Sequence, residues 1–194
     1  MTNHIYVATV RLAHALLIGL AITSAVPAAY ADADNAQDIV ARAKAQAHHE
    51  KKNVFVYFHA SWCPWCRQLD KLLDDPTYGP KFRASYVIAA VDIRERGERE
   101  KDENPGWDTL MASLRGAAEQ DVPYYVILSP MGKKLGDSYR GTSASIPDNA
   151  GYPQTEQEIT GFLELLKKTA PAFKPGDIKK LGNFFRAHSN PQPH

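Results

Sequence analysis

Residues 53–73, NVFVYFHASWCPWCRQLDKLL, contain the features that decide the fold of this chain. The stretch begins with a nearly continuous apolar and aromatic run at 53–60, a pattern typical of a strand that is buried on both faces. Cys63 and Cys66 follow at once, and leucines then recur at helical spacing. The sequence therefore predicts that the two cysteines lie where a buried strand ends and a helix begins.

Further helices and strands are predicted on both sides of this segment. Apolar residues at helical spacing indicate helices at 36–47, 107–114 and 155–166, the last opened by a capping box of Thr155 and Glu158. Apolar runs indicate strands at 85–93 and 123–129, and we expect residues 134–141 to return as a fourth strand after a turn. Helices and strands in this order predict an α/β fold.

The first 31 residues have the pattern of a targeting segment. Arg11 precedes an apolar run at 12–26, and small residues then end in Ala-Tyr-Ala at 29–31, which fits an A-x-A cleavage site. We expect a signal peptide at 1–31 that is cleaved near Ala31, so that the mature protein is periplasmic or secreted. The alternative is a retained membrane anchor, although the run is shorter than the roughly 20 residues that a membrane-spanning helix needs.

Length and charge limit the remaining possibilities. A chain of 194 residues can bury one sizeable core. We expect a main domain at 32–170 and a C-terminal appendage at 171–194 with a short helix and a disordered end. The formal net charge is +1, and no cluster of Lys and Arg alternates with aromatic residues, so we expect no nucleic-acid partner.

The spacing of the two cysteines, which are the only ones in the chain, restricts their chemistry. A disulfide that closes so short a loop removes little entropy from the unfolded chain, so a fold-stabilising role is disfavoured. A closed structural zinc site needs four ligands, and the sequence holds no second Cys-x-x-Cys. An isolated Cys-x-x-Cys in an exported chain therefore favours a redox-active dithiol.

The residues FHASWCPWC at 58–66 and DVPYYVIL at 121–128, in this order of helices and strands, resemble the thioredoxin superfamily. They look most like its small exported bacterial members. The resemblance covers about residues 36–168 and implies a thioredoxin-like fold with a central mixed sheet of four to five strands flanked by helices. It also implies a thiol–disulfide oxidoreductase that reduces or isomerises protein disulfides through Cys63 and Cys66, with no cofactor and no resident metal.

The expected turn assigns different roles to the two thiols. Cys63 should lie at the helix N-terminus, where free backbone N–H groups and the helix dipole favour a thiolate. We therefore expect Cys63 to be the exposed nucleophile that forms a mixed disulfide, and Cys66, one turn deeper, to resolve it. Pro64 suits the first helical position because it has no N–H to leave unpaired. Trp62 and Trp65 are candidate client contacts, with core packing as the alternative role of Trp62.

A second element comes from the family resemblance alone. In relatives the proline that matches Pro123 has a cis peptide bond and faces the cysteines, which leaves the neighbouring backbone free to pair with an extended client. Val122, Pro123 and Tyr124 are therefore the expected client-binding residues on this side of the site. A threonine is commoner at the position of Tyr124, so the client contacts of this chain are expected to differ.

Two residues on the strand before the cysteines are candidates for tuning the thiols. Many relatives carry a buried acid six residues before the first cysteine, and this chain carries Tyr57 there. A phenol, with a reference pKa of about 10, is no ready base at neutral pH. Cys66 then has to lose its proton to water, to the leaving thiolate of the client, or to another group such as His59. The alternative role of His59 is structural, as a hydrogen-bonded histidine in the core or at its rim.

Two function classes remain open. The first is the oxidoreductase, a monomer that acts on protein disulfide or thiol clients and takes electrons from a membrane thiol–disulfide donor. The second is a copper-binding protein, because two thiolates and a nearby His59 make a soft site suited to Cu(I). Nine of the thirteen residues at 94–106 are charged, which predicts a solvated loop or a partner-recognition loop, and residues 141–153 predict another exposed loop.

Overall fold

The computed structural model describes residues 33–115, 121–139 and 149–188 of the chain. Within these ranges β1 leads directly into the helix that carries the cysteines, as predicted. The elements follow one another in the order α1 (Ala36–Glu50), β1 (Asn53–His59), α2 (Pro64–Asp74), α3 (Gly79–Ser85), β2 (Tyr86–Asp92), η1 (Gly97–Asp102), α4 (Trp107–Arg115), β3 (Tyr124–Leu128), β4 (Lys134–Asp137), α5 (Glu156–Thr169) and α6 (Pro175–His188).

Strand β1 lies in the interior of a mixed sheet with the order β2-β1-β3-β4. It pairs in parallel with β2 and antiparallel with β3, and β4 pairs antiparallel with β3. The five inner residues of β1 are all buried, which explains why its sequence is an unbroken apolar run instead of an alternating one. The predicted mixed sheet of four to five strands is confirmed, with four strands in the part of the chain that the structure describes.

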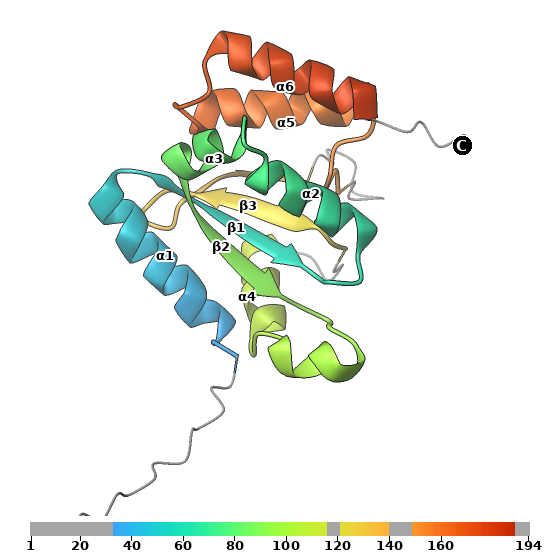
Figure 1. Ribbon diagram of the computed structural model, residues 1–194. Helices are drawn as coiled ribbons and strands as arrows, with labels where there is room; N and C mark the ends of the chain where they lie inside the picture. The colour runs from blue at the N-terminus through green and yellow to red at the C-terminus, as the bar shows by residue number, and fades with distance from the viewer. Residues whose placement is uncertain (1–32, 116–120, 140–148, 189–194) are drawn as a thin grey trace, which may run out of the picture. The chain divides into compact units, whose positions relative to one another are not determined.

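Helices cover both faces of this sheet (Figure 1). Helices α2, α3, α5 and α6 lie on one face over a core rich in aromatic and leucine side chains, and α1 and α4 lie on the other face over smaller aliphatic residues. Strand alternation divides β1 between the two cores: Phe55 and Tyr57 face the aromatic core, and Val54, Val56 and Phe58 face the aliphatic one. The side chains of β1 therefore contribute to both cores, one on each face of the sheet.

Helix α6 belongs to the aromatic core. It lies alongside α5 (Figure 1). Its residues Ile178, Leu181 and Phe185 are buried, and the ring of Phe185 meets that of Phe162 edge to face with centroids 5.5 Å apart. This helix is as long as α5, so it is more than the short helix expected for an appendage. Residues 189–194, for which a disordered end is predicted, lie outside the described residues.

The charged segment at 94–106 is exposed over most of its length, as its composition predicts, but two of its side chains point inward. Residues 97–102 form the 3-10 helix η1, and Glu95 and Asn104 on either side of it are buried. The amide of Asn104 accepts a hydrogen bond from the backbone N–H of Asp92 at 2.7 Å and donates one to the carbonyl of Asp34 at 2.9 Å. Polar side chains that point inward thus tie this segment to the sheet, and composition alone does not reveal their direction.

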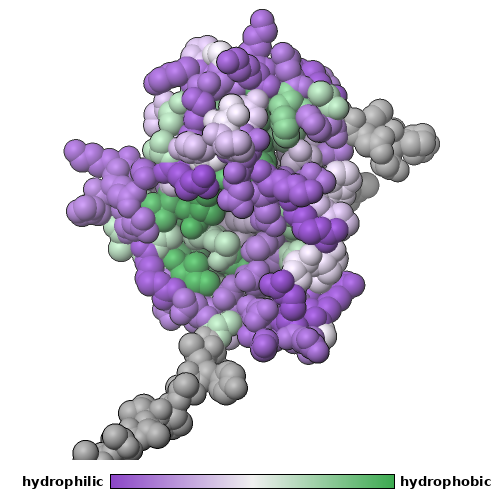
Figure 2. Space-filling model, viewed as in Figure 1, coloured by the Kyte–Doolittle hydropathy of each residue, from purple (hydrophilic) through white to green (hydrophobic). Residues whose placement is uncertain are grey.

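The surface in Figure 2 is mainly polar, with apolar side chains gathered in a hollow between polar ones. None of the helices in the described ranges is both apolar and long enough to span a bilayer. The predicted signal peptide at 1–31 lies outside the described residues, as does most of the predicted loop at 141–153.

Candidate active site

Cys63 is the N-cap residue of α2. Its backbone is extended, and its Sγ accepts a hydrogen bond from the backbone N–H of Cys66 at 3.3 Å, so the sulfur takes the place of the oxygen that caps most helices. Pro64 occupies the first turn of the helix, as predicted. A sulfur in this position faces the unpaired N–H groups and the positive end of the helix dipole, and both stabilise negative charge.

Both cysteines are free thiols, and they differ in what surrounds them. The expectation that Cys63 is exposed is wrong, because only 3% of its surface is accessible, against 0% for Cys66. Val122 and Trp62 pack over the cluster formed by the two cysteines and Ala60. Burial and the hydrogen bond with Cys63 raise the pKa of the Cys66 thiol well above its usual range. Cys66 therefore stays protonated at neutral pH until a partner removes its proton.

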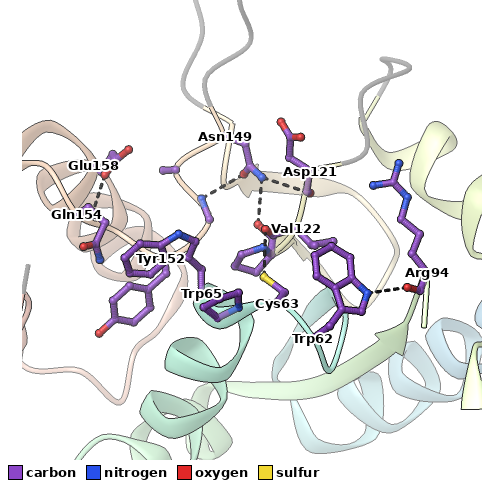
Figure 3. A pocket seen from close by; sticks show the side chains of 14 residues that line it. Trp62, Cys63, Trp65, Arg94, Asp121, Val122, Asn149, Tyr152, Gln154 and Glu158 are labelled. Atoms are coloured by element: carbon purple, nitrogen blue, oxygen red, sulfur yellow. Dashed lines mark hydrogen bonds between the residues drawn. The ribbon is translucent and has the colours of Figure 1, made fainter. Parts of the chain in front are cut away.

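The peptide bond between Val122 and Pro123 is cis, as the family resemblance implies. The thiol of Cys63 donates to the carbonyl of Val122 across a distance of 3.5 Å. Both residues and Cys63 line a groove of about 500 Å³ that is open to solvent (Figure 3). The first cysteine is thus placed at the floor of a groove whose wall is the segment before β3.

One wall of the groove is built from Trp62 and the segment that follows β2. The indole N–H of Trp62 donates to the carbonyl of Arg94 at 2.7 Å, and the guanidinium of Arg96 lies 3.9 Å from the centroid of its ring (Figure 3 shows the first of these contacts). Glu95 points inward and accepts two hydrogen bonds from Ser61, at 2.7 Å from its N–H and 2.5 Å from its hydroxyl. The charged segment therefore holds the turn that carries Cys63.

The opposite wall is aromatic. Trp65 is exposed and its ring stacks on that of Tyr152, with centroids 6.1 Å apart and planes 13° from parallel. Asn149 donates to the carbonyl of Pro123 at 3.1 Å and accepts from the N–H of Gly151, which joins this wall to the cis peptide (Figure 3). The groove thus runs between two tryptophans, one on each side of Cys63.

The predicted client contact at Tyr124 is wrong. This side chain is fully buried in the aliphatic core, stacks on Phe58 and donates its hydroxyl proton to Asp137 at 3.1 Å. Burial and the charge of Asp137 raise its pKa. The physical reason is strand alternation: Pro123 lines the groove, so the next residue of the chain points away from it.

Tyr57 and His59 lie beneath the active-site helix, and both face partners other than Cys63. The hydroxyl of Tyr57 donates to the carbonyl of Cys66 at 3.0 Å, and its ring stacks on His59 with centroids 4.6 Å apart. His59 Nε2 lies 3.0 Å from a carboxylate oxygen of Asp92, and Nδ1 lies 3.9 Å from one of Asp70. Asp70, beside the predicted residue His59, and Glu95, bonded to Ser61, are contacts that the sequence does not reveal.

The copper alternative rests on the thiols of Cys63 and Cys66, with His59 as a nearby third group. Within the described ranges no three or more His, Cys, Asp or Glu side chains are arranged to hold a metal ion, so Cys63, Cys66 and His59 do not form a three-ligand site. The site combines the thiol of Cys63, which caps α2, with Cys66, whose backbone N–H contacts the sulfur of Cys63. Cys63 also lines a groove that is open to solvent. Such an arrangement can accept an external sulfur at Cys63 and close an internal disulfide with Cys66.

The sequence of this chain is similar to those of known proteins. Residues 35–130 match the protein family described as Thioredoxin-like. A protein disulfide-isomerase of Hordeum vulgare is 28% identical over 138 residues, which are 71% of this chain and 20% of that protein. One of Ricinus communis is 40% identical over 60 residues, 31% of this chain and 11% of that protein. The matches thus span only a small part of these relatives.

Among solved structures, a disulphide isomerase from Xylella fastidiosa Temecula1 is 19% identical. Its TM-score is 0.44, and the match covers 86% of this chain and 100% of that one. A thioredoxin from Thermus thermophilus is 25% identical with a TM-score of 0.41, and the match covers 65% of this chain and 80% of that one.

Proposed function

Because residues 35–130 match the thioredoxin-like family, we propose that this chain is a thiol–disulfide oxidoreductase that reduces or isomerises the disulfides of client proteins. The observation that carries the proposal is the position of Cys63. Its sulfur caps α2, contacts the N–H of Cys66 and the carbonyl of Val122, and lines the groove. These contacts support Cys63 as the thiol that meets the client first and Cys66 as the thiol that follows.

The reaction that this geometry supports has two exchanges. The thiolate of Cys63 attacks one sulfur of the client disulfide, the client S–S bond breaks, and the departing sulfur takes the electron pair and then a proton. A mixed disulfide between Cys63 and the client results. Cys66 then loses its proton and attacks the sulfur of Cys63, which forms the internal disulfide and releases the second client thiolate. Two electrons pass from the protein dithiol to the client.

The groove gives the remaining predicted residues a shared role in client binding. Trp62, Trp65, Val122 and Pro123 all line it, so an extended client segment can lie between the tryptophans and beside the cis peptide. Aromatic walls provide apolar contact area without demanding a particular client sequence. Pro64 lines the groove as well and presents no N–H to a client.

We further propose that the protein is exported, with the segment at 1–31 acting as a signal peptide, and that it works as a monomer. The sequence pattern at 12–31 supports export. In an oxidising compartment a reductase needs a source of electrons, and a membrane thiol–disulfide carrier is the class of donor that fits. Edman sequencing of the protein recovered from the periplasm should begin near Asp32, and a mature chain that still begins at Met1 would contradict this part.

Trapping experiments test the catalytic roles. Cys66→Ser should accumulate mixed disulfides with clients, because the first exchange proceeds and the second cannot, and Cys63→Ser should trap few or none. The wild-type chain should reduce insulin in the presence of dithiothreitol, and both variants should not. Equal trapping by the two variants, or insulin reduction by Cys63→Ser, would overturn the assignment.

A further inference from the structure

The resolving thiol Cys66 has a carboxylate one helical turn away. Asp70 lies four residues after Cys66 on α2, and residues at this spacing share a helix face with their Cβ atoms about 5–6 Å apart. Cys66 is fully buried, whereas 40% of the Asp70 side chain is accessible to solvent. Asp70 therefore extends from the neighbourhood of the buried thiol to the surface.

Side chains of the sheet lie beside Asp70. His59 of β1 lies between two carboxylates, with Nδ1 at 3.9 Å from Asp70 and Nε2 at 3.0 Å from Asp92 of β2. The ring of His59 stacks on Tyr57, whose hydroxyl donates to the carbonyl of Cys66. A continuous set of contacts thus leads from the backbone of the resolving cysteine through two rings to Asp70.

The charge of Asp70 acts on the thiol and on the phenol. Burial is the largest cause that raises the pKa of Tyr57 far above its usual range, and the negative charge of Asp70 comes next. The same charge adds to the effects of burial and of Cys63 that raise the pKa of Cys66. The carboxylate is therefore close enough to influence both groups, and the phenol itself is a poor base.

We infer that Asp70 accepts the proton of Cys66 during resolution and that His59 is a positioning residue for its carboxylate. This inference rests on the proposed function. In this inference the carboxylate that accepts the proton lies on the helix α2. The strand position at which many relatives carry a buried acid is occupied by Tyr57 in this chain. The accessible part of Asp70 gives the proton a direct path to water.

The step balances as follows for a mixed disulfide at Cys63. The proton of Cys66 passes to a carboxylate oxygen of Asp70, and the sulfur of Cys66 attacks the sulfur of Cys63. The bond between Cys63 and the client sulfur breaks, and the client leaves as a thiolate with the electron pair. Asp70 then returns its proton to water or to that thiolate, so no further oxidant or reductant is needed.

The two effects of Asp70 have opposite signs, which makes the test decisive. Neutralising Asp70 removes a charge that opposes ionisation of Cys66, and this alone would speed resolution. Losing the proton acceptor slows it, and general bases contribute factors of about 10² to 10⁴ in rate. The titratable groups that face Asp70 or its neighbours are Tyr57 and His59 on β1, Cys63 and Cys66 at the start of α2, and Asp92 on β2.

The experiment uses 5,5′-dithiobis-(2-nitrobenzoate) with the reduced full chain. Attack by Cys63 releases the first thionitrobenzoate, and resolution by Cys66 releases the second, so the two phases report the two exchanges separately. We compare Asp70→Asn with Asp70→Glu and with the control Asp74→Asn. Asp74 ends the same helix, is exposed and lies 3.7 Å from Arg83, so its replacement makes the same charge change away from the thiols.

We expect Asp70→Asn to keep the first phase and to slow the second at least tenfold at pH 6, with a rate that then rises about tenfold per pH unit because hydroxide replaces the carboxylate. Asp70→Glu should restore much of the rate, and Asp74→Asn should behave as wild type. A second phase in Asp70→Asn that is as fast as wild type or faster, in a protein with unchanged circular dichroism, would overturn the inference. Absence of the first phase in wild type would instead contradict the proposed function.

Discussion

Replacing Glu95 with alanine should destabilise the active-site turn, although Glu95 lies 32 residues beyond Cys63 in the sequence. The side chain of Glu95 is completely inaccessible and accepts hydrogen bonds from the N–H and the hydroxyl of Ser61, at 2.7 and 2.5 Å. Its ion pair with Arg99, at 3.9 Å, contributes little because 57% of the arginine side chain is in solvent. The two bonds to Ser61 therefore carry most of the effect.

The magnitude follows from the types of bond lost. A hydrogen bond to a charged group contributes about 1.5–3 kcal/mol, and part of this is offset because the alanine variant no longer buries a carboxylate. We expect Glu95→Ala to lower the free energy of unfolding by about 2–4 kcal/mol, which corresponds to a melting temperature lower by roughly 5–15 °C. Glu95→Gln keeps the shape and one acceptor, so it should cost about 1–2 kcal/mol.

Thermal and urea unfolding of the reduced protein measure these changes, with Glu98→Ala as the control because Glu98 is exposed on the same segment. A double-mutant cycle with Ser61→Ala isolates the interaction, and we expect a coupling free energy of about 1–2 kcal/mol. If Glu95→Ala unfolds within 0.5 kcal/mol of Glu98→Ala, on the order of the error of additivity, the reasoning about this buried carboxylate is refuted.

Two further predictions concern Tyr57 and Cys66. Tyr57→Phe loses the hydrogen bond to the Cys66 carbonyl, so it should lower the free energy of unfolding by about 1 kcal/mol and keep most of the insulin-reductase activity; loss of nearly all turnover with the fold intact would show that the hydroxyl takes part in the reaction. Burial raises the pKa of Cys66, so above about pH 8.5 the unfolded chain loses a proton that the folded protein keeps, and the free energy of unfolding should fall by up to about 1.4 kcal/mol per pH unit. Urea unfolding of the reduced protein at pH 8, 9 and 10 measures this slope; Cys66→Ser should lack this contribution, and identical slopes in both proteins would contradict it.

Local patterns in the sequence predicted the elements that position the site. The nearly continuous apolar run at 53–60 and the leucines after Cys66 predicted a buried strand followed by an amphipathic helix, and β1 and α2 have this arrangement. The capping box at Thr155 and Glu158 is also present, with both reciprocal hydrogen bonds. These features depend on residues close together in the chain, so they can be recognised without knowledge of the fold.

The position of Tyr124 could have been predicted more accurately. If Pro123 faces the groove, strand alternation turns the next side chain to the opposite face of the sheet. The family resemblance suggested Tyr124 as a client contact because it follows the proline. The alternation of side chains along a strand, which argues against that role, could have been applied to the sequence alone.

By itself the sequence determined the strand, the helix and the place of the two thiols between them, because hydrophobic periodicity and capping are local. Only the tertiary structure decided which distant side chains meet at that turn. Glu95 turns inward to Ser61 and Tyr152 stacks on Trp65 because the segment after β2 and the residues before α5 pack against the turn. His59 approaches Asp70 because α2 packs on β1. The sequence does not show whether a charged or polar side chain faces water or a buried partner. Only the packing of distant segments in the folded chain determines which of these environments the side chain has.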